Sequence, residues 1–190
     1  MRIPKIYLAG PSVFRTNWKD LAQEMKDACA LRGAISLYPM DAAVTPPGGA
    51  HPLFALGLAI FAANTDLIDQ ADAVVADLSP FRGPSADVGT VWEIAYAQGQ
   101  GKPIAGFSTA SELYAARVPH TKAFPTYDYN TNSIEQCDMA DNLMIVGSLC
   151  RSNPREIPEM ASNGGFCRSF EDALDLVLER LYILKDESNA

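Results

Sequence analysis

Four short apolar segments alternate along the chain with longer segments whose apolar residues recur at helical spacing. The apolar segments cover residues 5–9, 34–38, 73–77 and 104–107, and the helical ones cover residues 17–31, 53–70 and 88–98. This alternation predicts a parallel sheet, because a crossover helix must return the chain before the next parallel strand begins. Residues 165–167 are expected to add an edge strand, and residues 142–149 and 169–184 two further helices. We therefore expect an α/β fold with a doubly wound (flavodoxin/Rossmann-like) parallel sheet of about five strands and helices on both faces.

Length and charge limit the classes of partner. The chain has 190 residues, enough for one domain with a full core, and its 15 Lys and Arg against 23 Asp and Glu give a formal charge of −8. Such a surface repels nucleic-acid polymers and anionic membranes. The longest mostly apolar run, residues 53–63, is shorter than the roughly 20 residues of a spanning helix, and no signal-peptide core precedes the first strand. We expect a single cytoplasmic domain.

The cysteines do not form a metal-binding pattern. None of the four belongs to a CxxC pair, and only His51 and His120 could join them as soft ligands. We therefore expect no metal site.

Three segments interrupt the regular pattern. Residues 41–52 are rich in Gly and Pro and are predicted as a loop, a candidate lid. Residues 130–165 are a candidate insertion, either a lid or an extra oligomer contact, and residues 186–190 are expected to form a flexible tail.

The ligand crevice of such a sheet lies at the carboxyl ends of the strands, where the strand order reverses. Residues 9–14, AGPSVF, follow the first strand. Gly10 would let a ligand approach the backbone, and Ser12 and Phe14 could bind or stack on it, although a plain turn also fits. Neither a GxGxxG nor a GxxxxGK[ST] motif occurs, so dinucleotide and P-loop chemistry lose their usual support.

The segment after the third apolar run is the densest in ionisable groups. Residues 76–93 contain Asp77, Arg82, Asp87 and Glu93. Asp87 stands at the expected start of a helix, where an N-cap is the simple alternative to a catalytic role. Glu93 is flanked by apolar residues inside that helix, and a buried carboxylate needs a partner or a catalytic function.

Asp87 and Glu93 can converge in only one arrangement. Six residues of helix correspond to roughly 240° of rotation, so the two carboxylates share a site only if Asp87 lies in the loop before the helix. Gly89 would then admit a ligand closely. Two carboxylates in different environments are what retaining glycosyl transfer uses, one as nucleophile and the other near the leaving group.

These motifs resemble a known family. Residues 71–103, ADAVVADLSPFRGPSADVGTVWEIAYAQGQGKP, are similar to the core of nucleoside 2-deoxyribosyltransferases. The opening KIYLAGPSVF at residues 5–14 and the NLM triplet at residues 142–144 resemble further motifs of the family, in the same order. The last helix resembles the family's C-terminal helix.

The resemblance implies a ping-pong transfer of 2-deoxyribose between nucleobases without metal or cofactor. Glu93 would be the nucleophile that forms a covalent deoxyribosyl-enzyme, and Tyr7 would orient it. Asp87 would contact the base and help to move its proton. Asn142 would bind the sugar 5'-hydroxyl of a neighbouring subunit's substrate, with Met144 packed beside it. The chain would then be a homo-oligomer, a dimer at minimum and, by resemblance, a trimer of dimers.

The base side of the site departs from the family pattern. Many bacterial members carry an aspartate where this chain has Asn64, although the alignment could shift to Asp66. Phe81 and Arg82 resemble a subset of the family in which they would border the base, and a surface turn is the alternative. The choice between purine-only and mixed specificity depends on loop geometry around Phe14, Phe81 and residues 41–52.

Two other functions remain open at this point. A deoxynucleoside 5'-monophosphate N-glycosidase of the same fold would hydrolyse its substrate and would need a phosphate-binding residue, typically serine, where Asn142 stands. A non-catalytic nucleotide-binding module would need a glycine-rich phosphate loop, but residues 47–49, PGG, are followed by Ala50 and His51 with no helix start in register.

Overall fold

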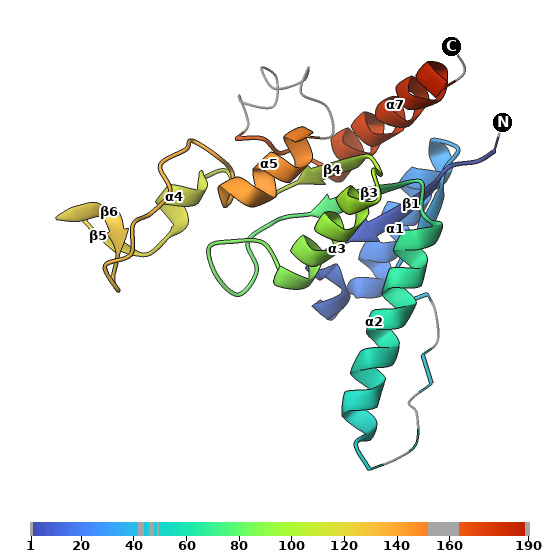
Figure 1. Cartoon of the computed structure of the whole chain (residues 1–190), viewed down its shortest axis with the longest axis horizontal. Helices are drawn as coiled ribbons and strands as arrows, with labels where there is room; N and C mark the ends of the chain where they lie inside the picture. Colours follow the sequence, from blue (N-terminus) through green and yellow to red (C-terminus); the bar gives the residue numbers. More distant parts are fainter. Residues whose placement is uncertain (1, 42–43, 46–47, 49, 152–163, 189–190) are drawn as a thin grey trace.

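The predicted parallel sheet is present in the computed structural model, which describes residues 2–41, 44–45, 48, 50–151 and 164–188. Four parallel strands lie in the order β2-β1-β3-β4 (Figure 1). Their bounds are β1 Lys5–Ala9, β2 Ile35–Leu37, β3 Ala73–Asp77 and β4 Ile104–Phe107. The chain runs from β1 outward to β2, then crosses back beyond β1 to β3, so the direction of winding reverses between β1 and β3. The α/β doubly wound fold is confirmed.

Helices cover both faces of the sheet because the strands are apolar on both sides. Ile6 and Leu8 face one core, which they share with α1 (Trp18–Leu31) and α7 (Phe170–Ser188). The alternate residues Tyr7 and Ala9 face a second core. That core includes residues of α2 (Pro52–Gln70), α3 (Val88–Gly99) and α5 (Leu143–Arg151).

The fifth strand is shorter than expected. Instead of a strand over residues 165–167, the structure has a single parallel bridge between Phe107 and Cys167. Two successive glycines with positive φ, Gly164 and Gly165, precede this point and bend the chain. The expected edge strand therefore contributes one bridge to the sheet.

A small antiparallel unit between β4 and α5 was not predicted. It consists of the one-turn helix α4 (Tyr114–Arg117) and the strands β5 (His120–Thr121) and β6 (Phe124–Asp128), and it lies at the left of Figure 1. Most of β6 is exposed, so the segment lacks the apolar alternation that identifies a half-buried strand.

The three irregular segments are only partly described. Residues 42–43, 46–47 and 49 of the candidate lid, residues 152–163 of the candidate insertion and residues 189–190 of the tail lie outside the described residues. The first part of the expected tail is not irregular, since α7 continues to Ser188.

Helix α2 carries much of the exposed apolar surface. It extends well beyond the sheet in Figure 1, and Leu53, Phe54, Leu58 and Phe61 are all exposed. By length and composition alone it is long and apolar enough to cross a membrane, although the run counted in the sequence was shorter. One such helix is by itself weak evidence for a membrane span, although α2 is mostly exposed.

Candidate active site

The site begins where β1 and β3 end side by side. Gly10, directly after β1, has a φ of 152°, and a Cβ added to it would lie 2.8 Å from Cβ of Asp77 at the end of β3. Only glycine fits so close to the end of β3. This contact places Gly10 and Asp77 at the reversal of strand order, the usual position of a ligand crevice. One carboxylate oxygen of Asp77 also accepts a hydrogen bond from the Ser79 amide, which shapes the turn out of β3.

Tyr7 and Glu93 form a hydrogen-bonded pair between β1 and α3. The buried Tyr7 hydroxyl, from β1, donates a 2.6 Å hydrogen bond to Oε1 of Glu93, from α3. Burial raises the pKa of Glu93 to about 7, the Tyr7 hydrogen bond opposes that rise, and the Asp87 charge adds to it. Burial, and then the Glu93 charge, raise the pKa of Tyr7 far above its usual range, so Tyr7 acts as a donor. The pair presents a carboxylate that titrates near neutral pH.

Asp87 occupies the loop position that convergence requires. It is the N-cap of α3, and its Oδ2 accepts hydrogen bonds from the amide and the hydroxyl of Thr90, at 3.0 and 3.2 Å. The simple capping role is thus present. It does not exclude a second role, because the Asp87 charge contributes to the raised pKa of Glu93 and so acts on the same site.

A side chain at position 89 would meet the carboxylate of Asp87. A Cβ at this residue would lie 3.0 Å from Oδ2 of Asp87. The absent side chain therefore makes room for the carboxylate of Asp87.

Phe14, Phe81 and Arg82 form a stack beyond the ends of β1 and β3, in which Phe14 and Arg82 are exposed and Phe81 is half-buried. The Phe14 and Phe81 rings stack with centroids 5.4 Å apart, and Cζ of Arg82 lies 5.2 and 4.6 Å from those two centroids. Arg82 has a φ of 57°, at the tip of a turn closed by the Phe81 amide and the Ser85 carbonyl. In the described part of the chain no hydrogen bond or ion pair engages its guanidinium. The stack joins the segments that follow β1 and β3.

Ser12 has a buried partner in the protein core. Its hydroxyl is buried and lies 3.1 Å from the hydroxyl of Tyr38, a residue of the core shared with α1 and α7. This contact gives Ser12 a structural partner on the opposite face of the sheet from Glu93.

Asn64 and Asp66, the two candidates on α2 for contact with the base, differ in burial. Asn64 is partly buried and Asp66 is exposed. Among the described residues, Oδ1 of Asn64 is buried without a hydrogen-bond partner. One turn earlier, Phe61 packs on Trp92, the neighbour of Glu93, with ring centroids 5.0 Å apart. An unpaired acceptor beside α3 makes Asn64 the better candidate for a substrate contact.

Asn142 immediately precedes α5 and has a capping bond. Its Oδ1 accepts from the Met144 amide at 2.9 Å, and its Nδ2 donates to Oε1 of Glu135 at 2.6 Å. The other oxygen of Glu135 accepts from the Leu143 amide. Met144 itself is 73 % exposed. Glu135 was not anticipated, because it lies seven residues before Asn142, farther than a capping box reaches.

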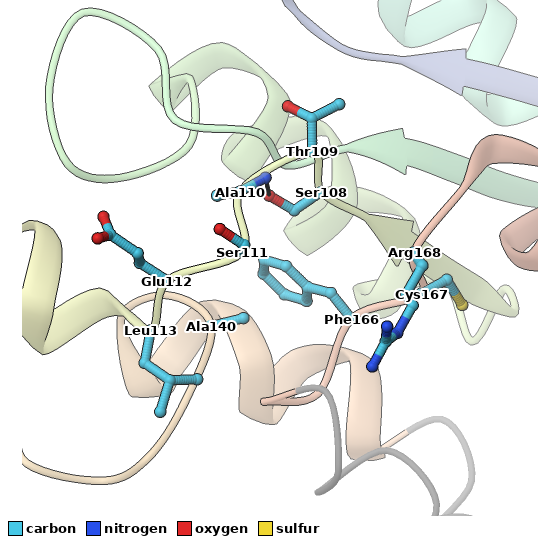
Figure 2. A pocket seen from close by; sticks show the side chains of 10 residues that line it. All are labelled: Ser108, Thr109, Ala110, Ser111, Glu112, Leu113, Ala140, Phe166, Cys167 and Arg168. Carbon is cyan, nitrogen blue, oxygen red and sulfur yellow. Dashed lines mark hydrogen bonds between the residues drawn. The ribbon is translucent and has the colours of Figure 1, made fainter.

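A separate cavity of about 320 Å³ lies beyond the end of β4 (Figure 2). Its lining includes Ser108, Thr109, Ser111, Phe166 and Arg168, and none of the predicted site residues. Thr109 connects this cavity to the turn after β3, since its amide donates to the Ser79 hydroxyl.

Three comparisons relate the chain to known proteins. The chain is 36 % identical over 118 residues to an uncharacterised protein of Schizosaccharomyces pombe, covering 62 % of this chain and only 56 % of that one. The fold is similar to a 2-desoxiribosyltransferase from Leishmania mexicana, with 30 % identity, a TM-score of 0.57, and 75 % and 85 % of the two chains covered. A 2-deoxyribosyltransferase from Bacillus psychrosaccharolyticus aligns with 22 % identity and a TM-score of 0.46, over 69 % and 97 %. The sequence model of the family described as nucleoside 2-deoxyribosyltransferase matches residues 6–144, from β1 to the start of α5. The chain belongs to the nucleoside 2-deoxyribosyltransferase family.

Proposed function

We propose that the protein transfers 2-deoxyribose from a 2'-deoxynucleoside to a free nucleobase. The carrying observation is the Tyr7–Glu93 hydrogen bond, which holds a carboxylate beside the reversal of strand order. The family match over residues 6–144 supports the same reaction class.

The reaction proceeds in two balanced steps. A carboxylate oxygen of Glu93 attacks C1' of the donor, the C1'–N bond breaks, and the base nitrogen leaves with the electron pair and takes up a proton. A second base then attacks C1' with its nitrogen, loses a proton, and the bond to Glu93 breaks. Two inversions at C1' give retention.

The surroundings of Glu93 suit this role. The nucleophile must be ionised, and its pKa of about 7 leaves a large fraction ionised at neutral pH. The Tyr7 hydroxyl stabilises the charged form and fixes the direction of the attacking carboxylate. Asp87, close enough to affect that pKa, is the group we assign to proton transfer at the base.

The stack of Phe14, Phe81 and Arg82 is proposed to border the base. Phe14 and Phe81 offer aromatic faces, and the donors of Arg82 are available to carbonyl or ring-nitrogen acceptors of a nucleobase. Asn64, with its buried unpaired oxygen, would contact the base from α2. Asn142 would bind the sugar 5'-hydroxyl.

We also propose that the protein is a homo-oligomer, at least a dimer, in which Asn142 completes a neighbouring site. The exposed apolar surface of α2, with Phe54 71 % exposed, supports an interface, as does the exposed Met144 beside Asn142. Light scattering after size exclusion tests the assembly, with Phe54→Glu expected to lower the mass. A fully active monomer would reject the role in trans.

The activity is tested with 2'-deoxyinosine or thymidine as donor and adenine as acceptor, without phosphate, by chromatography. Deoxyadenosine is the expected product, and the working donor distinguishes purine from pyrimidine specificity. Release of free deoxyribose alone would indicate a hydrolase. If neither reaction occurs, 2'-deoxynucleoside 5'-monophosphates are the next substrates, and their hydrolysis would overturn the proposal.

A further inference from the structure

Asp141 is a buried carboxylate with partners on two separate segments. Its side chain is fully buried. Oδ1 accepts from the Ser85 hydroxyl and from the Asn142 amide, the latter at 2.7 Å. Oδ2 accepts from the Ala86 amide at 2.9 Å. Asp141 therefore connects the loop before α3 to the residue before α5.

Arg117 joins the same two segments from a third position. Its Nε donates to the Pro84 carbonyl at 2.9 Å, and its Nη2 donates to the Ala140 carbonyl at 2.6 Å. Nη2 also lies 3.6 Å from Oδ2 of Asp141. The two charged side chains thus bridge residues 84–86 and 140–142, more than 50 positions apart in the chain.

Each bridged segment leads directly into a residue proposed for catalysis or substrate binding: Asp87 in the subunit's own site, and Asn142 in the neighbouring subunit's site. Ala86 precedes Asp87, the N-cap of α3, whose charge acts on Glu93. Asp141 precedes Asn142, whose amide group is held by Glu135. A small rotation at either segment would move Asp87 or Asn142 away from the substrate that it is proposed to contact.

Packing alone does not require a charged pair at this position. Buried ion pairs commonly contribute little to stability compared with apolar residues of the same volume, because burying the charges is costly. They do impose directional geometry, since each oxygen and each N–H must meet its partner. A carboxylate that accepts hydrogen bonds from three donors restricts the relative position of two backbone segments more than apolar contacts would.

We propose that Asp141 is a positioning residue that fixes Asp87, on the base side of its own subunit's site, relative to Asn142, which completes the sugar side of the neighbouring subunit's site. This inference rests on the proposed transferase function. Arg117 supports it by holding the flanking carbonyls. Asp141 does not touch the substrate and acts through the two residues that it positions.

The test is Asp141→Asn in the full-length protein, compared with Asp72→Asn. Asp72 is a matched control, because it also accepts a backbone amide, that of Lys5 at 2.8 Å, and an arginine, Arg2, but at the amino end of β3. Steady-state transfer is measured with 2'-deoxyinosine and with 2',5'-dideoxyinosine as donors. Thermal unfolding of each variant is measured alongside.

We expect Asp141→Asn to lower kcat/KM for 2'-deoxyinosine by 10-fold or more, and Asp72→Asn to change it less than 2-fold at a similar loss of thermal stability. The preference for a donor with a 5'-hydroxyl should shrink in Asp141→Asn, because Asn142 is no longer held in place. A purely structural role would lower activity without changing that preference.

Ser85→Ala is the second variant if Asp141→Asn does not fold. It removes one donor to Asp141 and keeps the carboxylate, so a loss of about 3-fold with a reduced 5'-hydroxyl preference is expected. Unchanged kcat/KM in folded Asp141→Asn, or a loss with an unchanged preference, would overturn the positioning role. If the wild-type protein transfers deoxyribose to no base, the proposed function fails and this inference fails with it.

Discussion

The hydroxyl of Tyr7 and the carboxylate of Glu93 are joined by a 2.6 Å hydrogen bond across 86 positions of the chain. Tyr7 is rigidly placed because it lies in β1, between β2 and β3, and is fully buried. Glu93 lies in the second turn of α3, on the face toward the sheet. The sheet thus fixes the direction of a carboxylate whose own burial would otherwise favour its neutral form.

Replacing Glu93 by Gln should abolish transfer, because the amide is a poor nucleophile of nearly the same shape. A loss of at least several orders of magnitude in kcat is expected if covalent catalysis carries the rate. Mass spectrometry of the wild-type protein mixed with donor alone should show an adduct of one deoxyribosyl group, absent in Glu93→Gln. Substantial activity in that variant would place the nucleophile elsewhere.

Replacing Tyr7 by Phe should move the acidic limb of the pH profile upward. The Tyr7 hydrogen bond lowers the pKa of Glu93, so its removal raises that pKa above about 7 and leaves less nucleophile ionised at neutral pH. We expect kcat/KM at pH 7 to fall more than kcat/KM at pH 9. A profile displaced to lower pH would contradict this orientation of the pair.

Replacing Asp87 by Asn should move the same limb in the opposite direction. The Asp87 charge raises the pKa of Glu93, so its removal lowers that pKa, while the Asn side-chain oxygen can still cap α3. The activity maximum should fall as well, because the side chain proposed to move the proton at the base is lost. A pH profile measured over pH 5–9 separates the two effects, and an acidic limb that stays in place would show that Asp87 does not act on Glu93.

The central sheet could be predicted because β1, β3 and β4 are mostly apolar and buried, without the polar alternation of a half-exposed strand. The strand predicted over residues 73–77 has the same bounds as β3. Its apolar run is easy to delimit, because Asp72 comes directly before it and Asp77 is its last residue. Strands β5 and β6 could not be predicted, because β6 is mostly exposed and its pairing with the two-residue β5 leaves no periodic pattern.

For the site as for the sheet, features set by neighbouring residues could be predicted, and features set by contacts between distant residues could not. The role of Asp87 as a cap follows from the helix start that begins one residue later. Sequence spacing could not show the Tyr7–Glu93 contact, which depends on how β1 packs under α3, and only the family resemblance suggested it. Asp141 accepts a hydrogen bond from Ser85, 56 positions away, and Arg117 donates one to Ala140, 23 positions away. Contacts across such distances leave no local sequence motif.

Replacing Arg82 by Met should weaken binding of the base and leave the chemical step largely intact. Methionine keeps an unbranched stem to pack on Phe14 and Phe81 but removes the charge and the donors. A rise in KM for the acceptor base of about 5- to 10-fold is expected from one lost hydrogen-bonding group. Arg2→Met, at the amino end of the sheet, is the control; equal effects of the two substitutions would remove Arg82 from the base site.

Replacing Glu93 by Gln should also stabilise the folded protein, but only above acidic pH. Folding raises the pKa of Glu93 from 4.5 to about 7, so the folded state binds the proton more tightly, and ionised Glu93 opposes folding. Below pH 4.5 the carboxyl group is protonated in both states and the substitution is nearly neutral. Between pH 4.5 and 7 the free energy by which ionised Glu93 destabilises the folded state grows, and above pH 7 it is constant. Because Glu93 keeps some solvent exposure, the gain in free energy of unfolding should be about 1 to 2 kcal/mol at pH 8.

Urea unfolding at pH 4 and pH 8, at one protein concentration, measures this difference. Glu24→Gln, on the exposed face of α1, is the control and should give no pH-dependent gain. If Glu93→Gln gains nothing at pH 8, burial does not oppose the ionisation of Glu93. The acidic limb near pH 7 would then need another titrating group. A gain at pH 8 together with lost transfer would show that the same buried carboxylate serves catalysis at the expense of stability.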